Sequence, residues 1–72
     1  MSTESLIKMA NQIARFFASE PDTALAVRSV RHHMQSFWTP AMRHELSAWQ
    51  REHQGEALHP LVQAALTEPA LN

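Results

Sequence analysis

Apolar side chains recur three and four positions apart in the first part of the chain, with polar side chains between them. The members of this stripe are Leu6, Ile7, Ala10, Ile13, Ala14 and Phe17. Such spacing predicts an amphipathic helix over about residues 3–18. Met9 and Phe16 widen the apolar arc beyond the width that one neighbouring helix covers. These two side chains either complete the core of a small bundle or form a second contact face for another protein.

A break at Ser19-Glu20-Pro21-Asp22 separates this helix from the next one. Pro21 cannot continue the preceding helix, and Asp22 is a favourable N-cap residue. We therefore expect a second helix over about residues 23–37. Its apolar stripe comprises Val27, Val30, Met34, Phe37 and Trp38, and its far side comprises Leu25, Arg28, His32 and Ser36.

The segment Phe37–Pro40 forms the central corner of the chain. Pro40 disfavours a helical conformation at Thr39, so the second helix should end by about Trp38. Thr39 can cap a third helix, and the missing N–H of Pro40 suits the first helical position. We expect this helix over about residues 40–54, with Gly55 closing it in a left-handed conformation. Its narrow apolar seam comprises Met42, Leu46, Trp49 and then His53, whereas Arg43, Ser47, Gln50, Arg51 and Gln54 should be solvated.

A short fourth helix is expected over about residues 60–67, beginning at Pro60 and ended by Pro69, with frayed residues after it. Its apolar side comprises Leu58, Leu61, Val62, Ala65 and Leu66. The chain contains one glycine, and β-hairpins commonly need Gly or Asn-Gly turns. The predicted fold class is therefore all-α: a small three- to four-helix bundle in a single domain, residues 1–72.

The chain is too short to build a large core, because it has 72 residues. In this size range a single core supplies only about 3–5 kcal/mol, and a staple usually adds to it. The chain has no cysteine, so a disulfide is excluded. We therefore expect a partner chain to contribute stability.

Composition also argues against several partners. The net charge of −1 lacks the basic character of a nucleic-acid binder, although the corner before the third helix resembles a helix-turn-helix. No apolar run reaches the length of a membrane span, and the N-terminus lacks the features of a secretory signal. We expect a cytoplasmic protein that binds neither nucleic acid nor membrane.

Five histidines raise the question of a metal site, but none of them are three or four residues apart on one helix. His53 and His59 could converge across the Gly55 loop, with Glu52 or Glu56 as a third ligand. We instead expect His53 to interact with the end of its own helix and His59 with the start of the next. Nucleophile elbows and glycine-rich phosphate loops are absent from the sequence, so we expect no catalytic, cofactor-binding or metal residues.

Three segments carry a resemblance to a known family: Leu6–Phe17, which includes Met-Ala-Asn-Gln-Ile; Phe37–Arg43, which reads Phe-Trp-Thr-Pro-Ala-Met-Arg; and Leu58–Leu66. In order and spacing they resemble the delta subunit of the NAD-dependent, molybdenum- or tungsten-containing formate dehydrogenases. The likeness covers nearly the whole chain apart from its ends and the loops near Pro21 and Gly55.

The resemblance implies a non-catalytic accessory subunit that supports assembly or stability of the large catalytic subunit of a formate dehydrogenase. It also implies that molybdopterin guanine dinucleotide, iron–sulfur clusters and FMN belong to other subunits. The alternative is a stand-alone helical adaptor or assembly chaperone that binds the apo-enzyme transiently. An isolated chain could also pair with itself through an exposed docking face.

The sequence suggests a partner-binding surface formed or supported by Met9, Phe16, Phe37, Trp38, Pro40, Met42 and Arg43. The competing interpretation assigns Phe37, Trp38 and Met42 to the core of this domain. Arg43 is the preferred interface residue because its charge should stay near the surface. On that basis, Arg43→Glu should weaken association and leave the isolated fold nearly intact.

Overall fold

A computed structural model describes residues 2–53 and 57–67 and contains four α-helices in that part of the chain. Helix α1 spans Thr3–Phe17, α2 spans Thr23–Phe37, α3 spans Pro40–His53 and α4 spans Pro60–Thr67. The all-α prediction is confirmed. Helix α1 ends one residue earlier than expected, since Ala18 is its C-cap. The expected roles of residues 54–56 and 68–72, Gly55 and Pro69 included, lie outside the described residues.

The helices begin at the predicted cap residues. The Leu25 amide donates to the Asp22 carboxylate over 3.2 Å, and the Met42 amide donates to the Thr39 hydroxyl oxygen over 3.2 Å. These bonds satisfy amides that have no partner within their own helix. Trp38 is extended, with φ −96° and ψ 146°, so α2 ends where Pro40 predicts.

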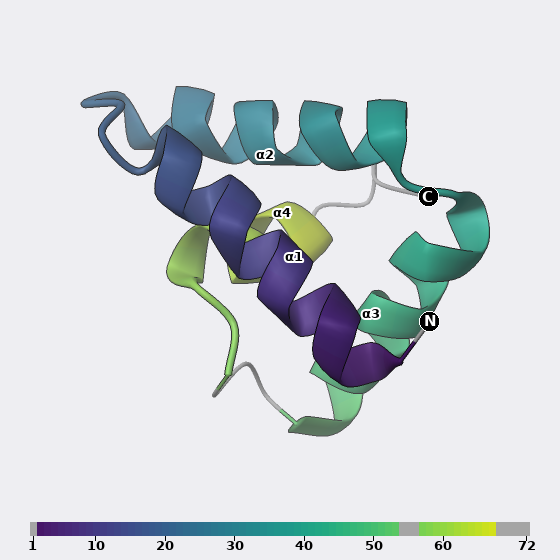
Figure 1. Cartoon of the computed structure of the whole chain (residues 1–72). Coiled ribbons are helices and arrows are strands. Elements are labelled where there is room, and N and C mark those ends of the chain that lie inside the picture. The colour runs from purple at the N-terminus through teal and green to yellow at the C-terminus, as the bar shows by residue number, and fades with distance from the viewer. Residues whose placement is uncertain (1, 54–56, 68–72) are drawn as a thin grey trace.

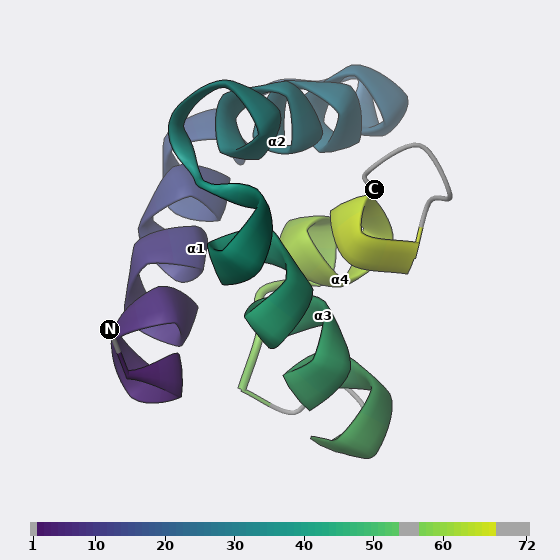
Figure 2. The same ribbon diagram turned by 90° about the vertical axis from the view of Figure 1, so that its right-hand side faces the viewer.

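Helices α1 and α2 converge at the turn that joins them and separate toward their other ends (Figure 1). Helix α3 descends from the end of α2, and α4 lies beneath α2 (Figure 2). The most extensive packing joins α2 and α4.

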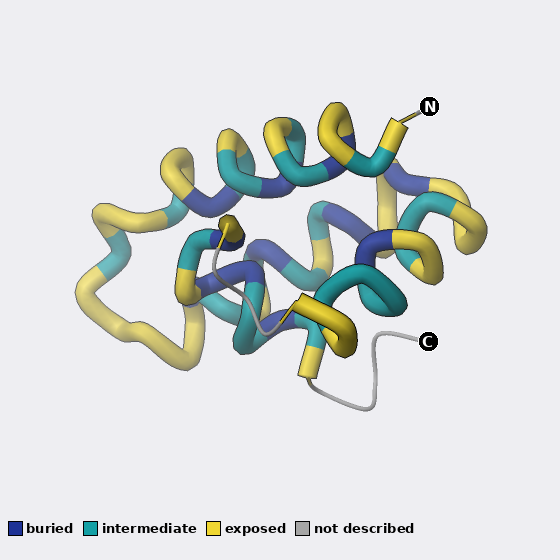
Figure 3. Tube along the Cα trace, turned by 90° about the horizontal axis from the view of Figure 1, so that it is seen from below, coloured by how far each residue is buried: buried dark blue, intermediate teal, exposed yellow. Residues whose placement is uncertain are grey.

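The core lies on the inner faces of all four helices (Figure 3). Its buried apolar residues are Leu6, Ala10, Ala14, Ala26, Val30, Met34, Trp38, Leu46, Leu58, Leu61, Val62 and Ala65. Ile13 and Phe17 were expected on the central stripe of α1, but they lie at its edge and are only partly buried. Arg43, Ser47 and Gln50 were expected to be solvated and are half-buried instead.

Asn11 of α1 is hydrogen-bonded to the segment that precedes α4. Its side-chain amide donates to the carbonyl oxygen of Ala57 over 2.9 Å, and its side-chain oxygen accepts from the His59 amide over 2.9 Å. The connection into α4 is therefore held against α1 by one side chain that uses both its donor and its acceptor. Thr3 donates a further hydrogen bond to the Glu45 carboxylate and so links α1 to α3.

Candidate docking surface

Two large aromatic side chains lie outside the core. Phe16 is 78% exposed and Phe37 is 74% exposed. The prediction that Phe37 belongs to the buried stripe of α2 is wrong. Phe37 is the last residue of α2, and the extended backbone at Trp38 turns the tryptophan, rather than Phe37, into the core.

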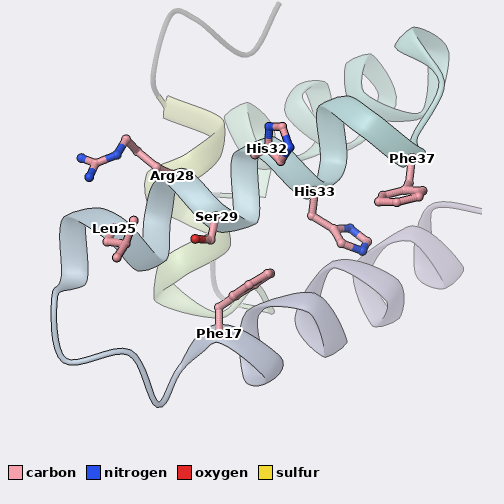
Figure 4. A pocket seen from close by; sticks show the side chains of 7 residues that line it. All are labelled: Phe17, Leu25, Arg28, Ser29, His32, His33 and Phe37. Carbon is pink, nitrogen blue, oxygen red and sulfur yellow. The ribbon is translucent and has the colours of Figure 1, made fainter.

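An open hollow of about 390 Å³ lies over the contact between α1 and α2. Figure 4 shows Leu25 near one end and Phe37 at the other, with Phe17 of α1 projecting toward α2 between them. Ser29 contributes a small side chain to the lining, and Arg28 projects from the outer edge. A neighbouring hollow of about 300 Å³ shares Phe17 and His33 with the first.

We call the two hollows together the α1/α2 groove. Its lining residues are Gln12, Ile13, Phe16, Phe17, Leu25, Arg28, Ser29, His32, His33 and Phe37.

Ring contacts fix the aromatic side chains around this groove. The centroids of His33 and Phe37 lie 4.7 Å apart, and those of Phe16 and Phe17 lie 5.0 Å apart with an edge-to-face angle of 86°. Both separations lie in the range that stabilises ring pairs. The exposed rings are therefore partly pre-positioned, which lowers the entropy lost when a partner covers them.

Several residues predicted to bind a partner have roles within the chain. Trp38 is 5% exposed and belongs to the core, and Met42 packs against the core while half-buried. The Arg43 guanidinium donates from Nη1 to the carbonyl oxygen of Trp38 over 2.9 Å and to that of Gln35 over 3.4 Å. Arg43 therefore donates to carbonyl oxygens at the C-terminal end of α2 and at its C-cap residue.

The remaining predicted contact residues divide in the same way. Pro40 is exposed at the start of α3, like Phe16 and Phe37 on α1 and α2. Met9 is half-buried and packs against the core. The predicted set is thus not one continuous surface: it separates into exposed side chains and side chains that hold the central corner.

The part of the groove that α2 contributes was not predicted from the sequence. Leu25, Ser29, His33 and Phe37 are spaced four residues apart, so they form a second stripe along one side of this helix. Leu25 was assigned to the far side of this helix because its neighbours there are Arg28 and His32. The four-residue spacing from Leu25 to Phe37 was the signal that could have found this stripe.

The histidines near the helix ends lie where the sequence predicted. His53 Nδ1 lies 3.0 Å from the carbonyl oxygen of Trp49, one turn earlier in α3. His59 Nδ1 accepts from the Leu61 amide over 3.1 Å at the start of α4. Among residues 2–53 and 57–67, no three His, Cys, Asp or Glu side chains come together as a metal-binding group.

The fold and this surface define a small all-α bundle with an open, largely apolar groove between its first two helices. Over the described ranges, none of these helices is both long and apolar enough to cross a membrane.

The family model for the NADH-dependent formate dehydrogenase delta subunit FdsD matches residues 5–66. The chain belongs to this family, whose members are subunits of a formate dehydrogenase complex. The resemblance inferred from the sequence is confirmed. Comparison with curated proteins and with solved structures found no significant match.

Proposed function

We propose that this chain is a non-catalytic accessory subunit that binds the large catalytic subunit of formate dehydrogenase and supports its assembly or stability. The observation that carries the proposal is the α1/α2 groove with Phe16 and Phe37 exposed beside it. Membership of the delta-subunit family supports the same assignment.

The energetics of the exposed rings favour a docking role. Covering the exposed three-quarters of each ring would contribute about 1–2 kcal/mol, since full burial of such a side chain is worth about 1.5–3 kcal/mol. A short chain with a small core gains proportionally more from this contribution than a large one does. Association would therefore stabilise the complex and the fold of this chain together.

On this proposal, exposed and supporting residues have different roles. Phe16, Phe37 and Pro40 contact the partner directly, because they are exposed. The supporting residues, which hold the helices that present these contacts, are Met9, Trp38, Met42 and Arg43.

The proposal also assigns the redox cofactors of the complex, namely molybdopterin guanine dinucleotide, iron–sulfur clusters and FMN, to other subunits. This chain contains no cysteine. Since cysteine thiolates are the usual ligands of iron–sulfur clusters, the composition supports that assignment.

The test is co-expression of the formate dehydrogenase subunits with and without this chain, followed by purification through a tag on the large subunit. We expect this chain in a fixed ratio to the large subunit, and a loss of cofactor content or of active lifetime per large subunit when it is omitted. Association with the apo-enzyme alone would instead identify a transient assembly chaperone. Formate oxidation by the purified chain alone, or a fully loaded and equally durable enzyme without it, would refute an accessory role.

A further inference from the structure

The groove-lining stripe of α2 has the length and shape of a helix-binding surface. Leu25 and Phe37 are twelve residues apart, which corresponds to about 18 Å along a helix axis. Three turns of a partner helix cover that distance, with apolar anchors at its two ends. Ser29 lies between the two apolar ends, and its small side chain leaves room for close approach.

Charge is distributed unevenly between helices α1 and α2 and the rest of the chain. Helices α1 and α2 contain four of the six Lys and Arg residues, although the chain as a whole has a net charge of −1. They contain one of the seven Asp and Glu residues, Glu4, which lies in the first turn of α1. The four cations are Lys8, Arg15, Arg28 and Arg31.

Among the described residues that line the groove, Arg28 is the one formally charged side chain. Arg28 and His32 are exposed and line it on the α2 side. Asp22 is the carboxylate at the Leu25 end, and it accepts the capping bond of α2 there. In a second copy packed groove against groove, the charged lining residue would again be Arg28, whereas carboxylates on a partner helix would complement it.

We propose that the α1/α2 groove binds an amphipathic helix of the partner subunit. This helix has about three turns, places apolar side chains over Leu25 and Phe37, and carries Asp or Glu along the edge that faces Arg28. The inference rests on the proposed function for the existence of a partner, and it adds which surface is used and what chemistry the partner segment presents.

Charge reversal tests the electrostatic part of the proposal in the co-expressed complex. Arg28→Glu places a carboxylate opposite the acidic edge, and Arg51→Glu makes the same change on the exposed side of α3 as a matched control. We expect Arg28→Glu to weaken association with the large subunit about tenfold or more, and Arg51→Glu to change it less than about threefold. Equal effects of the two substitutions would overturn the assignment.

Photo-crosslinking tests the location and the occupant. His32 is replaced by p-benzoylphenylalanine in the complex, with Arg51 replaced in the same way as the control. The expected result is a crosslink from position 32 to a helical partner peptide that contains Asp or Glu. Crosslinks to a second copy of this chain, to a non-helical or basic peptide, or from position 51 alone would overturn the groove assignment.

These outcomes separate the two proposals. If the wild-type chain co-purifies with the large subunit but the groove variants behave like their controls, the proposed function stands and the groove assignment fails. If the wild-type chain does not associate with the large subunit at all, the proposed function itself fails.

Discussion

Phe37 and Trp38 are adjacent aromatic residues with opposite environments, so truncating each one separates folding from docking. Trp38 is 5% exposed and Phe37 is 74% exposed. We expect Trp38→Ala to unfold much of the isolated chain and Phe37→Ala to leave its fold intact. In the complex, we expect Phe37→Ala to weaken association with the large subunit.

The magnitudes follow from burial. Replacing a buried tryptophan by alanine costs about 3–5 kcal/mol. In this size range a single core supplies only about 3–5 kcal/mol, so loss of Trp38 removes most or all of it. Because only a quarter of the Phe37 side chain is buried, Phe37→Ala should cost less than about 1 kcal/mol.

The assay is urea denaturation of the full-length isolated chain, followed by the helical circular dichroism signal. The unfolding midpoint of Trp38→Ala should fall strongly, or its transition should disappear, while the midpoint of Phe37→Ala stays close to wild type. Leu46→Ala is a positive control, because Leu46 is fully buried. If Phe37→Ala destabilised the chain as much as Trp38→Ala, Phe37 would belong to the core and the docking argument would lose one of its two exposed rings.

Three further substitutions test contacts that hold the corner and the ends of the fold. Asn11→Ala removes the bonds to Ala57 and the His59 amide, and it should lower the free energy of unfolding by about 1–3 kcal/mol in urea denaturation. Thr39→Ala removes the cap of α3 and should cost about 1 kcal/mol in the same measurement. Arg43→Glu removes two bonds to the end of α2 and places a carboxylate at the negative end of that helix dipole; it should lower the thermal midpoint of the isolated chain.

Matched substitutions separate the contributions of individual groups at Asn11 and Thr39. Asn11→Asp keeps the acceptor for the His59 amide but places a carboxylate oxygen against the Ala57 carbonyl oxygen, so it should also lower the free energy of unfolding and show that the donor is required. Thr39→Ser keeps the capping oxygen and should stay within about 0.5 kcal/mol of wild type. Unchanged stability of Arg43→Glu, combined with weaker association, would restore the sequence-based interpretation of Arg43 as an interface residue.

Helix boundaries could be predicted from the sequence because their determinants are local. Asp22, Thr39 and Pro40 act within one helical turn, and the structure places the starts of α2 and α3 where these residues predict. The fold class follows from the same local signals. Long-range contacts leave no comparable signal, so the role of Asn11, whose partners lie 46 and 48 residues away, could not be anticipated.

The docking surface was predicted only in part, for a geometric reason. Periodicity assigned Phe37 and Trp38 to the same stripe, but periodicity assumes that the helix continues. Helix α2 ends between the two residues, so Trp38 is buried as the stripe predicted and Phe37 is exposed. Arg43 was assigned to the surface because of its charge, and a sequence cannot show that carbonyls from the preceding helix lie within reach of its guanidinium.

The extensive packing of α4 against α2 has a consequence for biosynthesis. Val62 and Ala65 are among the last core residues to be made, and Asn11 acquires its partners only when residues 57–59 have emerged. A nascent chain that stops before α4 therefore lacks one wall of its interior, however well its earlier helices form. If another subunit binds only the completely packed fold, binding would begin only after translation has passed α4. Binding of that subunit to stalled ribosome complexes of increasing nascent-chain length would measure this timing.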